Sequence, residues 1–247
     1  MCFASRWRQA PPQPEVEAGA PFALGTAALE TIALTQFALE ADLCAVLDPW
    51  LRTNWLADES GRLAAQVQIG SIIPDFLLAL NRTSLSGAFR ARLTGFESAV
   101  LAQLLRRDPL RARTVAERLY SQPARTTRAL LRLTRLGLVN STSTGAFTTA
   151  LEGLAGTVEI VAIEAKLTRW REAIVQARAY LAFANRAFVA LPAPIVDRDH
   201  RVLEACQAAK LGLLAVSGDG VSVVSSAGFH EPRSASWVWA ASRLSAP

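Results

Sequence analysis

The sequence predicts an α/β protein whose core is interrupted by a basic, mainly helical insert. Before residue 82 and after residue 153, helical apolar spacing alternates with the short apolar runs typical of strands. Residues 82–153 carry 12 arginines against four acidic residues, a balance of +8, whereas the remainder has 14 basic and 17 acidic residues. Charged side chains also stand inside two of the apolar runs, where an unpaired charge is costly to bury.

These observations divide the chain into three parts. Residues 1–21 form a proline-rich tail, residues 22–81 and 154–247 form the core, and residues 82–153 form the inserted domain. The composition, 51% apolar and 19% charged, is that of a globular protein. No apolar run reaches the length of a membrane span, and the tail lacks the hydrophobic segment of a signal peptide. We therefore expect a soluble, cytoplasmic protein.

The soft metal ligands are few and dispersed. Cys2, Cys44 and Cys206 are far apart, and His200 and His230 are the two histidines. This spacing disfavours a zinc site, a disulfide framework and a histidine-based catalytic triad. We expect Cys44 and Cys206 to be packed core thiols.

The first half of the core is predicted to contain one helix and two strands. Apolar residues recur at helical spacing over 26–47, and Asp48–Pro49 is expected to interrupt that helix. Strands are expected over 63–70 and 71–80. Pro74 and Asp75 fall in the middle of the second strand, which should therefore bend or lie open there.

The second half of the core alternates strands and helices. Its last two strands flank a Gly-Asp-Gly hairpin turn, and the tryptophan-containing tail should pack over the sheet. The expected order is strand 157–165, helix 168–185, strand 187–191, helix 201–210, strands 211–217 and 221–226, and tail 234–244.

The insert has the element order of a winged helix-turn-helix domain, which it resembles. A first helix is expected over 96–106, and Thr114-Val-Ala-Glu117 has the spacing of a capping box that opens a second helix. Gln122–Pro123 precedes a third helix over 124–136. A hairpin of strands 138–141 and 146–149 completes the order.

The third helix of the insert carries a stripe of arginines. At about 100° per residue, four of them fall within an arc of roughly 80°, a pattern that suits phosphate contacts on duplex DNA. The residues expected to contact DNA are Arg125, Thr126, Arg128, Arg132 and Arg135. Two other interpretations stay open, namely an ordinary solvated face and an arginine bias inherited from a GC-rich genome.

The polar residues inside the core strands suggest a catalytic centre. Residues two apart on a strand share a face, so Glu164 and Lys166 should point the same way, about 7 Å apart. If the strand of Asp75 lies alongside, two carboxylates meet and a hard divalent cation would relieve their repulsion. Alternatively, Glu164 and Lys166 form an ion pair on an edge strand and Asp75 is a turn residue.

In these motifs the chain resembles the PD-(D/E)XK nuclease superfamily, the restriction-endonuclease-like fold. Pro74–Asp75 and Glu164–Ala165–Lys166 match its signature, and Gln176 and Tyr180 have the QxxxY spacing of many members. The resemblance implies a mixed sheet flanked by helices, with the winged helix inserted between the two motif strands. It implies that Asp75, Glu164 and the carbonyl of Ala165 hold Mg²⁺ or Mn²⁺, and that Lys166 serves catalysis.

Two further roles are implied by the same resemblance. Many members place a glutamate of the first core helix near the metal; Glu40 is the first candidate here and Glu30 the second. Gln176 is expected to reach the active site or a phosphate, and a surface role for it stays open.

These expectations combine into a Mg²⁺-dependent DNA endonuclease that acts in defence against foreign DNA or in repair. One alternative is a DNA-binding transcriptional regulator whose nuclease-like body is catalytically inactive. Another is a winged helix governed by a small-molecule sensor. Because a double-strand break needs two such centres, a homodimer is also an open alternative.

Overall fold

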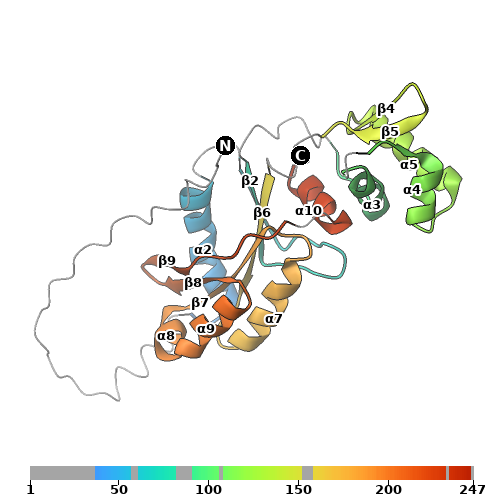
Figure 1. Ribbon diagram of the computed structural model, residues 1–247. Coiled ribbons are helices and arrows are strands. Elements are labelled where there is room, and N and C mark those ends of the chain that lie inside the picture. The colour runs from blue at the N-terminus through green and yellow to red at the C-terminus, as the bar shows by residue number, and fades with distance from the viewer. Residues whose placement is uncertain are drawn as a thin grey trace, which may run out of the picture.

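A computed structural model describes residues 37–56, 61–81, 91–105, 108–151, 158–231 and 234–245. It shows an α/β fold in which helices flank a mixed six-stranded sheet, as predicted (Figure 1). The strand order is β1-β2-β6-β7-β8-β9; β6, β7 and β8 are parallel, and the other neighbouring pairs are antiparallel. The strands are β1 (Arg62–Ala65), β2 (Phe76–Asn81), β6 (Val158–Ala165), β7 (Arg186–Pro192), β8 (Gly212–Ser217) and β9 (Gly220–Ser225).

Helices cover both faces of this sheet. One face packs on α2 (Glu40–Trp55), and the other packs on α7 (Trp170–Tyr180), α9 (His200–Ala208) and α10 (Ala235–Ser245). A short helix, α8 (Ala193–Arg198), follows β7 and was not predicted. Every residue of β6 is buried, because this strand lies inside the sheet with helices over both faces. The end of β6 is therefore a sheltered position for polar chemistry.

The prediction for the first helix was wrong at its C-terminal end. Residues 37–39 precede the helix, which runs through Asp48–Pro49 to Trp55; the earlier part of the expected range lies outside the described residues. A buried stripe at four-residue spacing, Leu43, Leu47 and Leu51, holds the helix to the sheet across the proline. Tertiary packing thus outweighs the backbone hydrogen bond that Pro49 cannot make.

The two strands around Asp75 are shorter than predicted. β1 ends at Ala65, because Gln66 adopts a left-handed conformation with φ of 51°. β2 begins at Phe76, so Pro74 and Asp75 lie just before the strand and not in its middle. The Gln66 amide donates to the Asp75 carbonyl at 3.1 Å. Asp75 therefore sits at the end of a closed loop.

The described residues of the insert form three helices and a small antiparallel sheet of order β3-β5-β4. The second helix begins at Ala112, so the capping box expected at Thr114 was wrong; such a box is found instead at Thr94 and Glu97, before the first helix. The elements are α3 (Gly95–Leu104), β3 (Leu110–Arg111), α4 (Ala112–Arg118), α5 (Pro123–Arg135), β4 (Val139–Ser141) and β5 (Ala146–Thr149).

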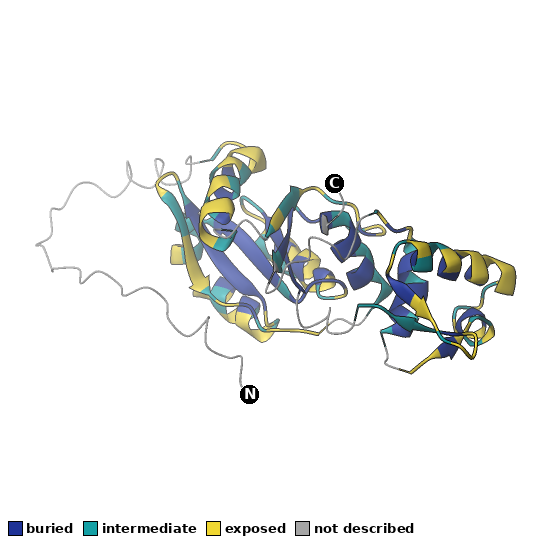
Figure 2. Ribbon diagram, turned by 90° about the horizontal axis from the view of Figure 1, so that it is seen from above, coloured by how far each residue is buried: buried dark blue, intermediate teal, exposed yellow. Residues whose placement is uncertain are grey.

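The insert is joined to the core through helix packing. α3 contacts α10 of the core on one side and α5 on the other (Figure 1). Figure 2 shows buried residues, in dark blue, on the strands of the core and on helices of the insert. α10 in turn packs against β1, β2 and β6. Among the described residues, no helix is long and apolar enough to cross a membrane.

Candidate active site

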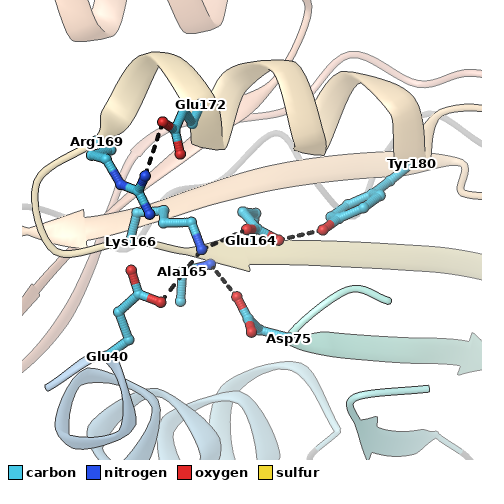
Figure 3. A network of polar contacts seen from close by, with 8 residues as sticks. All are labelled: Glu40, Asp75, Glu164, Ala165, Lys166, Arg169, Glu172 and Tyr180. Atoms are coloured by element: carbon cyan, nitrogen blue, oxygen red, sulfur yellow. Dashed lines mark hydrogen bonds and ion pairs between the residues drawn. The ribbon is translucent and has the colours of Figure 1, made fainter. Parts of the chain in front are cut away.

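The candidate site lies where β6 ends beside the start of β2. The antiparallel register of these strands pairs Phe76 with Ile163, which brings the preceding Asp75 to the end of β6. There Oδ2 of Asp75 accepts a hydrogen bond from the backbone amide of Ala165 at 2.8 Å (Figure 3). The structure thus brings together two motifs that are 90 residues apart in sequence.

Glu164 is the most deeply buried charged group of the site. Its residue is 3% exposed, and its Oε1 lies 3.1 Å from Nζ of Lys166. Its Oε2 accepts a hydrogen bond from the hydroxyl of Tyr180, at the last turn of α7. The carboxylate is therefore held from two sides, by the lysine that follows its strand and by a phenol of the next helix.

Lys166 follows β6 and links α2 to the sheet. Its amide donates to the Ala190 carbonyl of β7 at 3.0 Å, which fixes the backbone. Its Nζ also lies 3.4 Å from Oε2 of Glu40, in the first turn of α2. Figure 3 shows this ammonium between the glutamates of α2 and β6.

Burial dominates the electrostatics of the site. It raises the pKa of Asp75 and of Glu164. The Ala165 amide lowers the pKa of Asp75, the Tyr180 hydroxyl lowers that of Glu164, and the charge of Lys166 lowers both, but burial outweighs these effects. Burial opposes the charge of Lys166, but Glu164 and Glu40 outweigh it and raise the pKa of the ammonium. Two carboxylates that carry an unfavourable desolvation cost are suited to bind an added cation.

The donor atoms fit a magnesium ion held by few protein ligands. Mg²⁺ commonly uses one or two carboxylates and keeps several waters, and Asp75 and Glu164 supply such a pair. Glu40 points instead to Lys166. Within the described ranges, no group of three or more histidine, cysteine, aspartate or glutamate side chains is placed to hold a metal.

Of the other residues predicted for the site, Ala165 lies in it and Gln176 faces solvent. Ala165 lies between the two charged residues and is buried, with its amide on Asp75. Gln176 is exposed on α7, one turn before Tyr180. Glu30 lies outside the described residues.

Two residues of the site were not predicted from sequence. Tyr180 has the QxxxY spacing from Gln176, and that spacing is the signal that could have placed it at the site. Cys44 lies one turn after Glu40, and burial together with the charges of Asp75, Glu40 and Glu164 raises its pKa to about 12. The thiol therefore stays protonated at neutral pH and is not a nucleophile.

The arginine stripe of α5 is divided between packing and solvent. Arg125 stacks on the Phe96 ring of α3, 4.1 Å from its centroid, and Arg132 forms an ion pair with the buried Glu97 of α3. Arg128 and Arg135 are exposed. Two arginines of the stripe thus contact the insert's own first helix, although Arg125 is itself exposed, and Arg128 and Arg135 face solvent.

The expectation that Thr126 contacts DNA is corrected by the structure. The residue is fully buried, and its hydroxyl lies 2.6 Å from the hydroxyl of Ser121. The helical period explains this position, because Thr126 shares a face with the buried Leu130 and Leu133.

Two apolar side chains near that helix face solvent instead. Tyr120, in the turn between α4 and α5, is 98% exposed and has a left-handed φ of 48°. Leu131 is 49% exposed on α5 itself.

Comparison with known proteins gives no family. No protein-family model and no curated protein matches the chain. Among solved structures, a protein of unknown function from Silicibacter pomeroyi matches at 24% identity over 30% of this chain and 51% of that chain, with a TM-score of 0.23. The match thus spans about half of that chain, and a likeness this weak carries no argument about fold or activity.

Proposed function

We propose that the protein is a metal-dependent nuclease with a restriction-endonuclease-like core and an inserted winged-helix domain that binds duplex DNA. The observation that carries this proposal is the hydrogen bond from the Ala165 amide to Asp75. It sets a second carboxylate beside the Glu164–Lys166 pair, at the sheltered end of a buried strand. The strand order and the three-helix insert with its small sheet support the same assignment.

Each residue has a distinct role in this proposal. Asp75 and Glu164 hold the ion, and Tyr180 positions Glu164 through its hydroxyl. When bound, Mg²⁺ polarises the phosphodiester and lowers the pKa of a bound water. Lys166 donates a hydrogen bond to the charge that develops on the phosphate. Glu40 keeps the lysine ammonium near the carboxylates before DNA arrives.

The test compares cleavage and binding in one set of variants. Purified protein is incubated with plasmid, linear duplex and single-stranded DNA, in Mg²⁺ or in EDTA. We expect Lys166→Ala to lose cleavage by at least about 100-fold, the usual size for loss of a catalytic charge stabiliser, and to retain DNA binding. The matched control is Lys210→Ala, which changes the other lysine of the chain, an exposed residue after α9. Undiminished Mg²⁺-dependent cleavage by Lys166→Ala would refute this centre.

The main alternative is a DNA-binding regulator with an inactive nuclease-like body. One observation favours it: both oxygens of Glu164 are already engaged, by Lys166 and by Tyr180. This alternative predicts tight DNA binding in the same assay with no cleavage in any metal. It also predicts that Asp75→Asn leaves Mg²⁺-dependent thermal stability unchanged.

A further inference from the structure

A cavity of about 450 Å³ lies between β1, the residues before α3, and α10. Its walls come from three parts of the chain, namely β1 and the loop after it, the residues just before α3, and α10. Two of its lining residues are arginines and none is acidic. The lining residues are Ala64, Val67, Gln68, Arg92, Trp239 and Arg243.

Two residues of this lining each carry a hydrogen-bond donor that is buried and has no partner in the described part of the chain. Nε1 of Trp239 and Nε of Arg243 are both buried, and neither has an acceptor in the described part of the chain. A buried donor without an acceptor costs about 1–3 kcal/mol, and the cost is higher for a charged group. Native structures rarely keep such groups unless an ion, a water or a ligand satisfies them.

The geometry of α10 keeps these donors together. The guanidinium of Arg243 lies 5.8 Å from the centroid of the Trp239 ring, one helical turn away. The indole ring itself packs against Gly95, at the start of α3. The third polar group, the side-chain amide nitrogen of Gln68, already donates to the Gly70 carbonyl at 2.9 Å. The buried donors without an acceptor therefore belong to the tryptophan and to Arg243, and Arg92 adds an exposed guanidinium to the lining.

The chemistry of this lining selects an anion with many acceptor oxygens. Guanidinium groups bind phosphate through paired hydrogen bonds, and two of them would balance the charge of a phosphate monoester. The indole and the side chains of Ala64 and Val67 supply an apolar wall for a flat base. The volume falls within the range of small-molecule sites, roughly 300–1,000 Å³.

We propose that this cavity binds the phosphate ester of a nucleotide, at a site separate from the Asp75–Glu164 centre. The ester belongs either to a free mononucleotide, which presents a phosphate monoester, or to a nucleic-acid strand, which presents phosphodiesters. Both offer anionic phosphoryl oxygens that the same guanidinium groups can bind. Binding would connect Arg92 of the insert to α10 and β1 of the core. This site requires only phosphate recognition, so it stands whether or not the protein cleaves DNA.

The experiment measures binding of two probes in EDTA, so that no cleavage intervenes. AMP is titrated by calorimetry, and a short fluorescein-labelled duplex is titrated by anisotropy. The variants are Arg92→Glu, at an exposed position, and Arg243→Met, which keeps most of the buried stem. The matched control is Arg198→Glu, at an exposed position of α8, which packs on β7 and β8 and not on β1. Circular dichroism and thermal unfolding check that each variant is folded.

We expect each cavity variant to weaken binding by about ten-fold or more, the usual effect of losing a charge-assisted hydrogen bond, while Arg198→Glu leaves it unchanged. Loss of AMP affinity assigns the site to a free nucleotide. Loss of duplex affinity alone assigns it to a strand phosphate. If neither variant changes either affinity, the proposal is overturned. If the protein binds AMP in an arginine-dependent manner but cleaves no DNA, the nucleotide site is supported and only the proposed nuclease activity is refuted.

Discussion

At the scale of single residues, the site consists of charged groups in a buried environment that disfavours their charged forms. Asp75 and Glu164 are carboxylates whose pKa values burial raises, and the local hydrogen bonds offset that effect only in part. A protein built for stability alone would place apolar groups there. Retaining the charges at the end of β6 is what a functional site requires, and stability is commonly lower for it.

Tyr120, on the insert, is another residue whose position lowers the stability of the fold. A non-glycine residue in the left-handed region is strained, and an exposed ring returns no packing energy. We expect Tyr120→Gly to stabilise the fold by a few tenths to about 1 kcal/mol, because relief of strain exceeds the entropy cost of glycine. If the ring contacts DNA, the same variant binds duplex more weakly. Urea unfolding and anisotropy measure the two effects.

The control for that prediction is Tyr120→Asn, because asparagine tolerates the left-handed conformation and lacks the ring. It should also bind DNA more weakly. If both variants bind as the wild type does, the ring has no part in DNA binding.

At the scale of elements, the ion pair between α3 and α5 fixes the orientation of the arginine-bearing helix. The side chain of Glu97 is 9% exposed and that of Arg132 is 41% exposed. We expect Arg132→Ala to lower the free energy of unfolding by about 1–2 kcal/mol, less than for a fully buried pair because solvent screens the arginine. Arg135→Ala, at an exposed position of the same helix, should change it by less than about 0.5 kcal/mol.

This ion pair also predicts a pH dependence. Burial alone would raise the pKa of Glu97, but hydrogen bonds from Arg132 and Thr94 outweigh it and lower the pKa. The stabilisation is therefore present above the unfolded pKa of about 4.3 and is lost as pH falls through the folded value. The difference between wild type and Arg132→Ala should shrink below about pH 4 in urea unfolding. A difference that is constant with pH would contradict this assignment.

Elements were predictable from sequence where local pattern and packing agree. β6 and β7 are continuous apolar runs, and their predicted positions are within one residue of those observed. The passage of α2 through Pro49 was not predictable, because it depends on Leu43, Leu47 and Leu51 packing against strands far away in sequence. The left-handed turn at Gln66 likewise ended β1 early against its alternating pattern.

The candidate site was partly predictable, because part of it follows from local sequence pattern. Asp75, Glu164 and Lys166 stand out because each charge interrupts or follows an apolar run. The hydrogen bond from Tyr180 to Glu164 depends on how α7 packs against β6, and sequence spacing alone does not determine that packing. Nor did the arc of arginines reveal that Arg125 and Arg132 face α3.

At the scale of the whole molecule, positive charge is concentrated in the insert and the carboxylate site lies in the core. If the insert binds DNA, its exposed arginines should dominate the salt dependence. We expect combining Arg128→Ala and Arg135→Ala to weaken duplex binding by about ten-fold and to reduce the slope of log affinity against log salt by about two. Anisotropy titrations over a salt series measure both quantities. With Arg198→Ala as the control, an unchanged slope would mean that the two arginines do not contact phosphate.

The packing of α3 between α10 and α5 has a consequence for where a nuclease of this build would cut. Because α3 contacts both α10 and α5, the carboxylate site of the core and the arginine-bearing face of the insert keep a fixed separation. That separation would determine the distance between the bound DNA segment and the cleaved bond. Scission would fall a constant number of base pairs from the bound segment, whatever the intervening sequence.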